Sequence, residues 1–132
     1  MTTAWICATL LGLLVFALGL RVSMTRGATK TNYGYTPDPT DRLYKAVRAH
    51  GNATEYAPML AVLILMVGAR NPSSWIEWTM IAAVAARYIQ AADMITCRSL
   101  AEVNVLRASG SVATYLAGFV LVVAAFLRTS AG

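Results

Sequence analysis

The chain has 132 residues, of which 58% are hydrophobic and only 13% are charged. Soluble domains carry roughly 25% charged residues, so this composition excludes an ordinary soluble protein and favours a membrane protein. The net charge of +5 would suit a nucleic-acid partner, but the basic residues gather beside apolar segments, and we therefore expect no nucleic-acid binding.

Four apolar segments predict four membrane helices within a single domain that covers residues 1–132. Runs without charge cover residues 4–20, 57–69, 78–86 and 108–127. A transmembrane helix needs about 20 mostly apolar residues. Two runs qualify alone, and the other two qualify if polar residues are allowed at their cytoplasmic ends. We predict an all-α, four-transmembrane-helix bundle with helices at about 4–24, 41–69, 75–98 and 104–128.

Local signals support this division of the chain in order. The first helix lacks both a basic n-region and a small-x-small site, so we expect it to be retained and not cleaved as a signal peptide. The stretch RGATKTNYGYTPDPT is a predicted loop, and Asp38, Thr40 or Asp41 is the expected cap of the next helix. Pro58 predicts a mild kink inside that helix. Small residues over 108–118 predict close packing of the fourth helix.

The basic residues predict how the helices are oriented. Arg70 and Arg128 mark one side of the membrane. Eight other basic residues flank the first and third connections, namely Arg21, Arg26, Lys30, Arg42, Lys45, Arg48, Arg98 and Arg107. By the positive-inside rule these two connections are cytoplasmic, and both termini lie outside the cytoplasm. Cys7 and Cys97 then lie near opposite faces, and we expect no disulfide between them.

Polar residues form a stripe along the second helix. At about 100° per residue, Arg48, Asn52, Glu55 and Tyr56 share one face, whereas His50 falls near 200° from Arg48. We therefore exclude His50 from the predicted site. Ionisable groups in a membrane segment are costly and usually functional, so this stripe predicts a binding site.

The third helix adds a deep arginine, Arg87, with Gln90 one turn further on. An arginine keeps its proton, and the acidic residues expected to pair with Arg87 are Glu55 and Asp93. Arginines outnumber carboxylates in this half of the bundle, which favours a zwitterionic ligand with several carboxylates held by bidentate contacts. The alternative is a set of buried ion pairs that fixes helix register.

Three stretches resemble the MAPEG superfamily, the membrane-associated proteins in eicosanoid and glutathione metabolism. They are RAHGNATEYAP at 48–58, LRVSMTR at 20–26 and LRASGSVAT at 106–114, and the last two are similar to the small bacterial members. The resemblance implies a homotrimer in the bacterial inner membrane that binds glutathione between neighbouring subunits.

The resemblance also implies which residues bind glutathione and which one activates its thiol. The implied glutathione-binding residues are Arg26, Arg48, Asn52, Glu55, Tyr56, Arg87, Tyr88 and Gln90. The second tyrosine of the third-helix signature is Ala92 here. The catalytic arginine is Arg107, at the start of the fourth helix, with Arg98 as its rival.

The function implied is that of a membrane-bound glutathione transferase or peroxidase. The thiol, bound at the cytoplasmic-side subunit interface, would be activated by a guanidinium and would attack lipophilic electrophiles dissolved among the membrane lipids. No metal is expected. The alternative is a non-catalytic lipid- or thiol-binding membrane scaffold. A small multidrug exporter needs a carboxylate in the first helix, and residues 4–20 contain none.

Overall fold

A computed structural model describes the backbone of residues 1–129 and the side chains of residues 1–127. Within that range the chain is all-α, as predicted, with four helices: α1 (Thr2–Thr29), α2 (Arg42–Gly68), α3 (Ser74–Thr96) and α4 (Val105–Thr129). The side chain of Arg128, which was counted with the outer charges, lies outside the described residues.

Helix α1 is longer than the sequence predicts, because it continues past residue 24 to Thr29. Thr29, which lies in the predicted loop, instead donates its hydroxyl to the Thr25 carbonyl one turn back, at 2.9 Å. Ser23 and Thr25 do the same just before it, at 3.2 and 2.8 Å. The helix ends only at Lys30, which adopts the left-handed conformation with φ 53°, a frequent way for helices to end.

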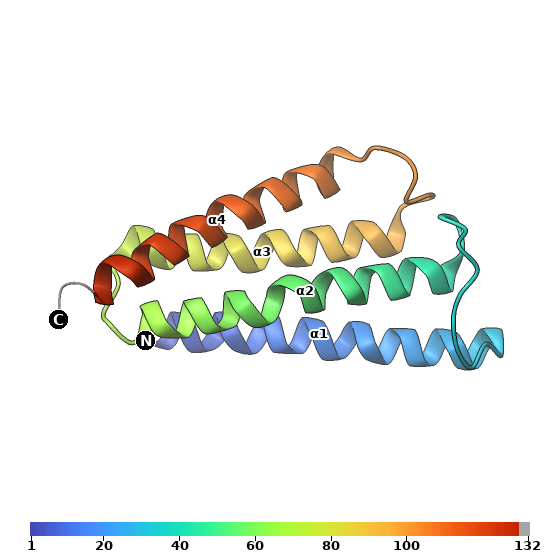
Figure 1. Cartoon of the computed structure of the whole chain (residues 1–132), viewed down its shortest axis with the longest axis horizontal. Helices are drawn as coiled ribbons and strands as arrows, with labels where there is room; N and C mark the ends of the chain where they lie inside the picture. The colour runs from blue at the N-terminus through green and yellow to red at the C-terminus, as the bar shows by residue number, and fades with distance from the viewer. Residues whose placement is uncertain (130–132) are drawn as a thin grey trace.

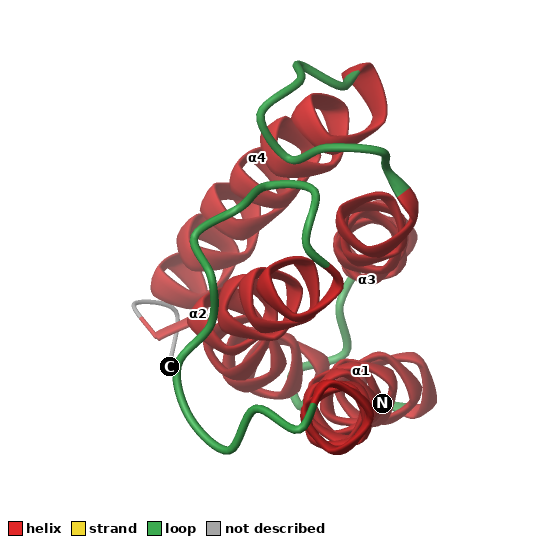
Figure 2. Ribbon diagram, turned by 90° about the vertical axis from the view of Figure 1, so that its right-hand side faces the viewer, coloured by secondary structure: helices red, strands yellow, loops and turns green. Residues whose placement is uncertain are grey.

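The helices run alternately up and down in an elongated bundle (Figure 1). The N-terminus, the α2–α3 turn and the end of α4 lie at one end of the bundle, which we call the terminal end. The α1–α2 and α3–α4 connections lie at the other, the loop end. Seen along its length, α4 leans away from α1 (Figure 2), and among the described residues these two helices share no contacts. The bundle is therefore two hairpins, α1–α2 and α3–α4.

Three of these helices, α1, α2 and α4, are long and apolar enough to cross a membrane. Helix α3 is less apolar because it contains Glu77, Arg87 and Asp93. Its 23 residues nevertheless extend about 34 Å at 1.5 Å per residue, enough for a hydrocarbon core about 30 Å thick. Large apolar side chains cover the outside, including Phe16 at 80% exposure and Phe119 at 70%. Such a surface suits lipid contact.

Small residues let α1, α2 and α3 approach closely. Helix α2 buries Ala46, Ala49, Ala53 and Ala57 at spacings of three or four, which places them on one face. Leu11, Ile64, Met80 and Leu121, one from each helix, are completely buried in the terminal half. Helix α2 continues without a break through Pro58.

Contacts of the α3–α4 connection with the α1–α2 connection and with the start of α2 close the loop end. The Leu100 N–H donates to the Pro39 carbonyl at 3.0 Å, and Lys45 Nζ donates to the Cys97 carbonyl at 3.0 Å. The cap of α2 is Asp41, which accepts from the Tyr44 N–H at 2.8 Å and is one of the three predicted caps.

Asp38 stabilises the turn just before α2. Both the Thr40 backbone N–H and the Thr40 hydroxyl donate to Asp38 Oδ1 at 2.8 Å. These hydrogen bonds hold the pKa of the Asp38 carboxyl below its usual value, because they favour its charged form.

Gly68→Ala is expected to destabilise the bundle. A Cβ at Gly68 would collide with the Cβ of Ala4 on α1, and overpacking of this kind typically costs about 1–3 kcal/mol. Gly12→Ala is the control, because a Cβ at Gly12 meets nothing within 4 Å. Thermal unfolding in detergent measures both variants. Equal melting temperatures would show that α1 and α2 are not in tight contact at Gly68.

Candidate functional site

Arg87 is the most deeply buried charged residue that the structure describes, with 1% of its surface exposed. Its Nη2 donates to the Asn52 side-chain and backbone oxygens at 2.5 and 3.1 Å. Its Nη1 donates to Gln90 Oε1 at 2.5 Å. The guanidinium carbon also lies 5.1 Å from the centre of the Tyr56 ring, within cation–π range. Arg87 therefore joins α3 to α2 through the Asn52 oxygens and the Tyr56 ring, while its contact with Gln90 stays within α3.

The prediction that Arg87 pairs with a carboxylate is wrong, because its hydrogen bonds go to neutral oxygens. Glu55 is exposed on the surface of α2 and makes no ion pair among the described residues. Asp93, two turns beyond Arg87, instead faces α4, where its Oδ2 lies 3.9 Å from Arg107 Nη1. Amide oxygens can hold a guanidinium without adding a second buried charge, which would cost further desolvation.

Helix α4 extends this network with two hydroxyl side chains, those of Ser111 and Tyr115. Gln90 Nε2 donates to Ser111 Oγ at 2.8 Å. The hydroxyl oxygens of Tyr56 and Tyr115 lie 2.7 Å apart, while the Thr114 hydroxyl donates to its own helix. We name the connected residues the polar cluster: Asn52, Tyr56, Arg87, Gln90, Ser111 and Tyr115.

Gly110 brings α4 close enough for these contacts. A Cβ at this position would lie 3.1 Å from both the Ala86 carbonyl oxygen and Gln90 Cβ. A glycine therefore permits a closer approach of the two helices than any other residue would. As a consequence Ser111, the next residue, lies within hydrogen-bond distance of Gln90.

Arg107 lies one turn before Ser111 and holds the α3–α4 connection. Its Nη2 donates to the carbonyl of Leu100 at 3.2 Å and to the carbonyl of Glu102. Its Nη1 is buried and has no hydrogen-bond partner in the described chain, and the same is true of Asp93 Oδ2. These two atoms lie 3.9 Å apart as an ion pair, so a ligand that enters between α3 and α4 would compete with this pair for the Arg107 guanidinium.

Three cavities follow one another along the α2–α4 side of the bundle. The loop-end pocket, about 420 Å³, includes Asn52, Gln90, Arg107 and Ser111 in its lining. The central cavity, about 20 Å³, is enclosed by the polar cluster and Thr114, and a volume of this size can hold one water. The apolar groove, about 240 Å³, begins at Tyr56 and Tyr115 and continues over apolar residues of α2 and α4. Polar-cluster residues therefore line all three cavities.

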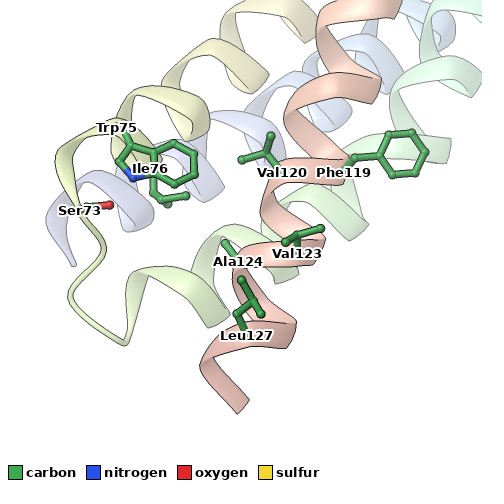
Figure 3. Close-up of a pocket in the computed structure, with 8 residues that line it drawn as sticks. All are labelled: Ser73, Trp75, Ile76, Phe119, Val120, Val123, Ala124 and Leu127. Atoms are coloured by element: carbon green, nitrogen blue, oxygen red, sulfur yellow. The ribbon is translucent and has the colours of Figure 1, made fainter. Parts of the chain in front are cut away.

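A further groove near the terminal end is chemically different. It has a volume of about 400 Å³ and lies between the start of α3 and the second half of α4 (Figure 3). Trp75, Ile76 and Phe119 are among its lining residues, and Ser73 supplies the single side-chain hydroxyl. Because no ionisable side chain lines it, this groove offers no acid, base or charge for catalysis.

The predicted site residues divide into two groups. Asn52, Tyr56, Arg87 and Gln90 meet in the polar cluster, with Arg107 at the loop-end pocket and Glu55 at the apolar groove. The others lie apart from these cavities. The side chains of Arg48 and Arg98 are exposed, Arg26 donates to the Gly34 carbonyl at 2.9 Å, and Tyr88 donates to the Leu10 carbonyl at 2.8 Å.

His50 was predicted to lie outside the site. In the structure it lies on the face of α2 that meets α1. A Cβ at Gly19 would approach His50 Nε2 to 3.3 Å, so this imidazole packs beside α1, away from the polar cluster.

Ser111 and Tyr115 were not predicted as site residues, because the start of the fourth helix was interpreted as packing alone. The signal was available, since Arg107, Ser111 and Tyr115 recur every four residues. Four residues advance a helix by about 400°, so these side chains follow one face. The same test found the stripe on the second helix.

A comparison with the curated proteins gives no significant match. The family model of the MAPEG family, in contrast, matches residues 4–127 of the chain, a range that includes nearly the whole of the helical bundle and every residue of the polar cluster. The chain therefore belongs to the MAPEG family, whose fold is a membrane helical bundle.

Proposed function

We propose that the protein is a glutathione transferase or peroxidase that conjugates or reduces lipophilic electrophiles. This proposal rests on the order in which the three cavities follow one another along the bundle. A polar pocket at the loop end and an apolar groove further along α2 and α4 are separated by one polar cluster. Such an arrangement suits a reaction between one water-soluble and one lipid-soluble substrate.

The loop-end pocket has the chemistry for a thiol peptide such as glutathione. Its volume of about 420 Å³ lies in the usual range for small-molecule sites. Asn52, Gln90 and Ser111 offer amide and hydroxyl groups, and Arg107 offers a cation for a carboxylate or a thiolate. Family membership supports this ligand, because the MAPEG family includes glutathione transferases and peroxidases.

Arg107 is the group that we assign to thiol activation. Its Nη1 is buried without a hydrogen-bond partner among the described residues, and the residue lines the loop-end pocket. A guanidinium beside a thiol lowers the thiol pKa by stabilising the thiolate. Arg98 is exposed and lines none of the three cavities, which supports Arg107 over its rival.

A homotrimer would complete the site from a neighbouring subunit. Arg48 and Glu55 are exposed on the surface of a single chain, and on a membrane helix such groups face protein or water far more often than lipid. A second subunit packed on this face would cover them and give them partners. The basic residues near the loop end, including Arg26 and Lys45, support a cytoplasmic location for that end by the positive-inside rule, in a bacterial inner membrane.

The alternative, a non-catalytic lipid- or thiol-binding scaffold, is favoured by the contacts of Arg107. Its Nη2 is held by the Leu100 and Glu102 carbonyls, and its Nη1 faces Asp93. An arginine held in this way can be structural. Measuring the thiol's ionisation separates the two functions.

In the enzyme, glutathione bound to the protein should absorb as a thiolate near neutral pH, where free thiols, with pKa about 8.5, are mostly protonated. Arg107→Ala should abolish this absorbance, whereas Arg98→Ala should retain it. Ultraviolet difference spectra with and without glutathione measure the effect, and melting temperatures verify folding. Wild-type protein that binds glutathione without forming a thiolate would be a binder and not a transferase.

Arg48→Ala and Glu55→Gln should weaken glutathione binding more than His50→Ala. The first two remove charges on the stripe, and losing one partner of a buried charged contact costs about 2–5 kcal/mol. His50 packs toward α1 and serves as the control. Calorimetric titration of the three variants measures the difference, and equal affinities would remove the stripe from the binding site.

The mass of the detergent-solubilised protein should correspond to three chains, because the proposed homotrimer would cover Arg48 and Glu55 with a neighbouring subunit. Light scattering with correction for bound detergent measures it. A stable monomer or dimer would contradict a site shared between three subunits.

A further inference from the structure

We propose that Asp93 is a positioning residue that holds the Arg107 guanidinium in place and weakens its attraction for an anionic ligand in the loop-end pocket. The inference rests on the proposed function only in identifying that ligand as a glutathione thiolate. The contact itself follows from the packing of α3 on α4, which places a carboxylate beside the cation assigned to thiol activation.

Asp93 can act on such a ligand only through Arg107. Its side chain is 5% exposed, against 19% for Arg107, and its Oδ2 lies 3.9 Å from Arg107 Nη1. Of these two residues, Arg107 lines the loop-end pocket and Asp93 does not. A ligand in the pocket therefore meets the guanidinium first, and the buried carboxylate changes the charge that the ligand experiences there.

Asp93 and Arg107 form an ion pair without a hydrogen bond. Their separation of 3.9 Å exceeds the usual N–H···O distance of about 2.7–3.2 Å, and neither facing atom has a hydrogen bond among the described residues. The α3–α4 connection also holds the guanidinium, because Nη2 donates to the Leu100 and Glu102 carbonyls. Arg107 thus keeps a buried N–H that Asp93 attracts but does not satisfy, and an anion in the pocket can bind it.

The charge of Asp93 determines how strongly the pocket attracts an anion. Charges interact more strongly inside a protein than in water, so a thiolate beside Arg107 is attracted by the guanidinium and repelled by the carboxylate. The other charged side chains toward this end of α3 and around the pocket are Lys45, Arg87, Arg98 and Glu102. None of these four forms an ion pair within the described part of the chain. Asp93 is therefore the carboxylate that offsets the Arg107 charge.

A weakened cation favours reactivity of the thiolate. The nucleophilicity of a thiolate falls as the pKa of its thiol falls, and the best attacking thiol has a pKa near the ambient pH. A guanidinium without a carboxylate beside it would keep the thiol ionised but less reactive. By offsetting part of the Arg107 charge, Asp93 favours a thiolate that still attacks a lipophilic electrophile.

The pH dependence of thiolate absorbance tests this role in the full-length protein, reconstituted in nanodiscs and saturated with glutathione. Asp93→Asn removes the charge but keeps an oxygen facing Arg107. The pH at which half of the bound thiol is ionised should fall by about one pH unit, because a nearby like charge is lost. The fully ionised form should react about threefold more slowly with 1-chloro-2,4-dinitrobenzene, as a Brønsted coefficient of about 0.4–0.5 implies. In that reaction the sulfur bonds to the ring carbon and chloride leaves.

Two further variants separate the charge of Asp93 from its structural contribution. Glu77→Gln removes the same charge from the same helix, about 24 Å away at 1.5 Å per residue, and should leave both measurements unchanged. Asp93→Glu keeps the charge and adds a methylene that can close the 3.9 Å gap, so its half-ionisation pH should equal or exceed the wild-type value. A purely structural role for Asp93 predicts the opposite sign, with weaker thiolate formation in Asp93→Asn.

A half-ionisation pH that stays constant or rises in Asp93→Asn would overturn the proposal. If that variant does not fold, Asp93→Glu decides, because a value below that of the wild type would contradict the offset charge. If the wild-type protein forms no thiolate, the proposed function fails, and inorganic sulfate replaces glutathione as the probe. At equal concentration, sulfate should raise the melting temperature of Asp93→Asn more than that of Glu77→Gln, since guanidinium groups bind oxyanions bidentately. Equal increases would remove this role of Asp93 as well.

Discussion

The buried guanidinium of Arg87 is the constraint on which the polar half of the bundle depends. An arginine within a membrane-spanning bundle remains charged and must be satisfied by groups that the protein supplies. Here the acceptors are amide oxygens from α2 and α3, with the Tyr56 ring against the guanidinium. Gln90 in turn donates a hydrogen bond to Ser111 on α4. One buried charge thereby fixes the relative positions of three helices.

This way of satisfying the charge also keeps carboxylates out of the centre of the bundle. Had Arg87 paired with an acidic residue, that residue would be unavailable to a ligand. Instead Glu55 remains at the surface of α2, and Asp93 pairs with Arg107 at 3.9 Å, where neither of the two facing atoms has a hydrogen bond among the described residues. The two Nη groups of Arg87 are held by neutral oxygens, although its buried Nε has no hydrogen-bond partner among the described residues, and the charged side chains of Glu55 and Arg107 line the cavities. Rigid support and ligand contact are therefore assigned to different residues.

Much of the fold was predictable because hydrophobicity dictates it. Long uncharged segments predicted four helices, and the charge distribution predicted which connections share an end. The end of α1 was misjudged because Gly27 and Thr29 were interpreted as loop residues, although hydroxyls such as that of Thr29 can also bond to the preceding turn of a helix. A sequence does not reveal which choice such residues make, since the neighbouring chain decides it.

The site was predictable as a set of residues but less so as a set of contacts. Helical phasing grouped Arg48, Asn52, Glu55 and Tyr56 within about 100° of arc. The buried alanines of α2, including Ala49 and Ala53, centre near 140° on the same scale. Asn52 and Tyr56 lie on the side of the stripe nearest to them and turn inward, while Arg48 and Glu55 turn outward. Locating that dividing line requires knowing where α3 and α4 pack, which one helix alone cannot show.

The order of the polar residues along the chain bears on how this protein enters its membrane. Helix α2 is synthesised before α3, so Asn52 and Tyr56 emerge before the arginine that they hold. Inserting an arginine at the centre of a membrane helix costs about 2.5–3.5 kcal/mol on the scale derived from insertion experiments. An α1–α2 hairpin already in the bilayer presents an amide and an aromatic face to the arriving α3, and so lowers that cost. Because synthesis runs from the N-terminus, Asn52 and Tyr56 thus enter the membrane before Arg87.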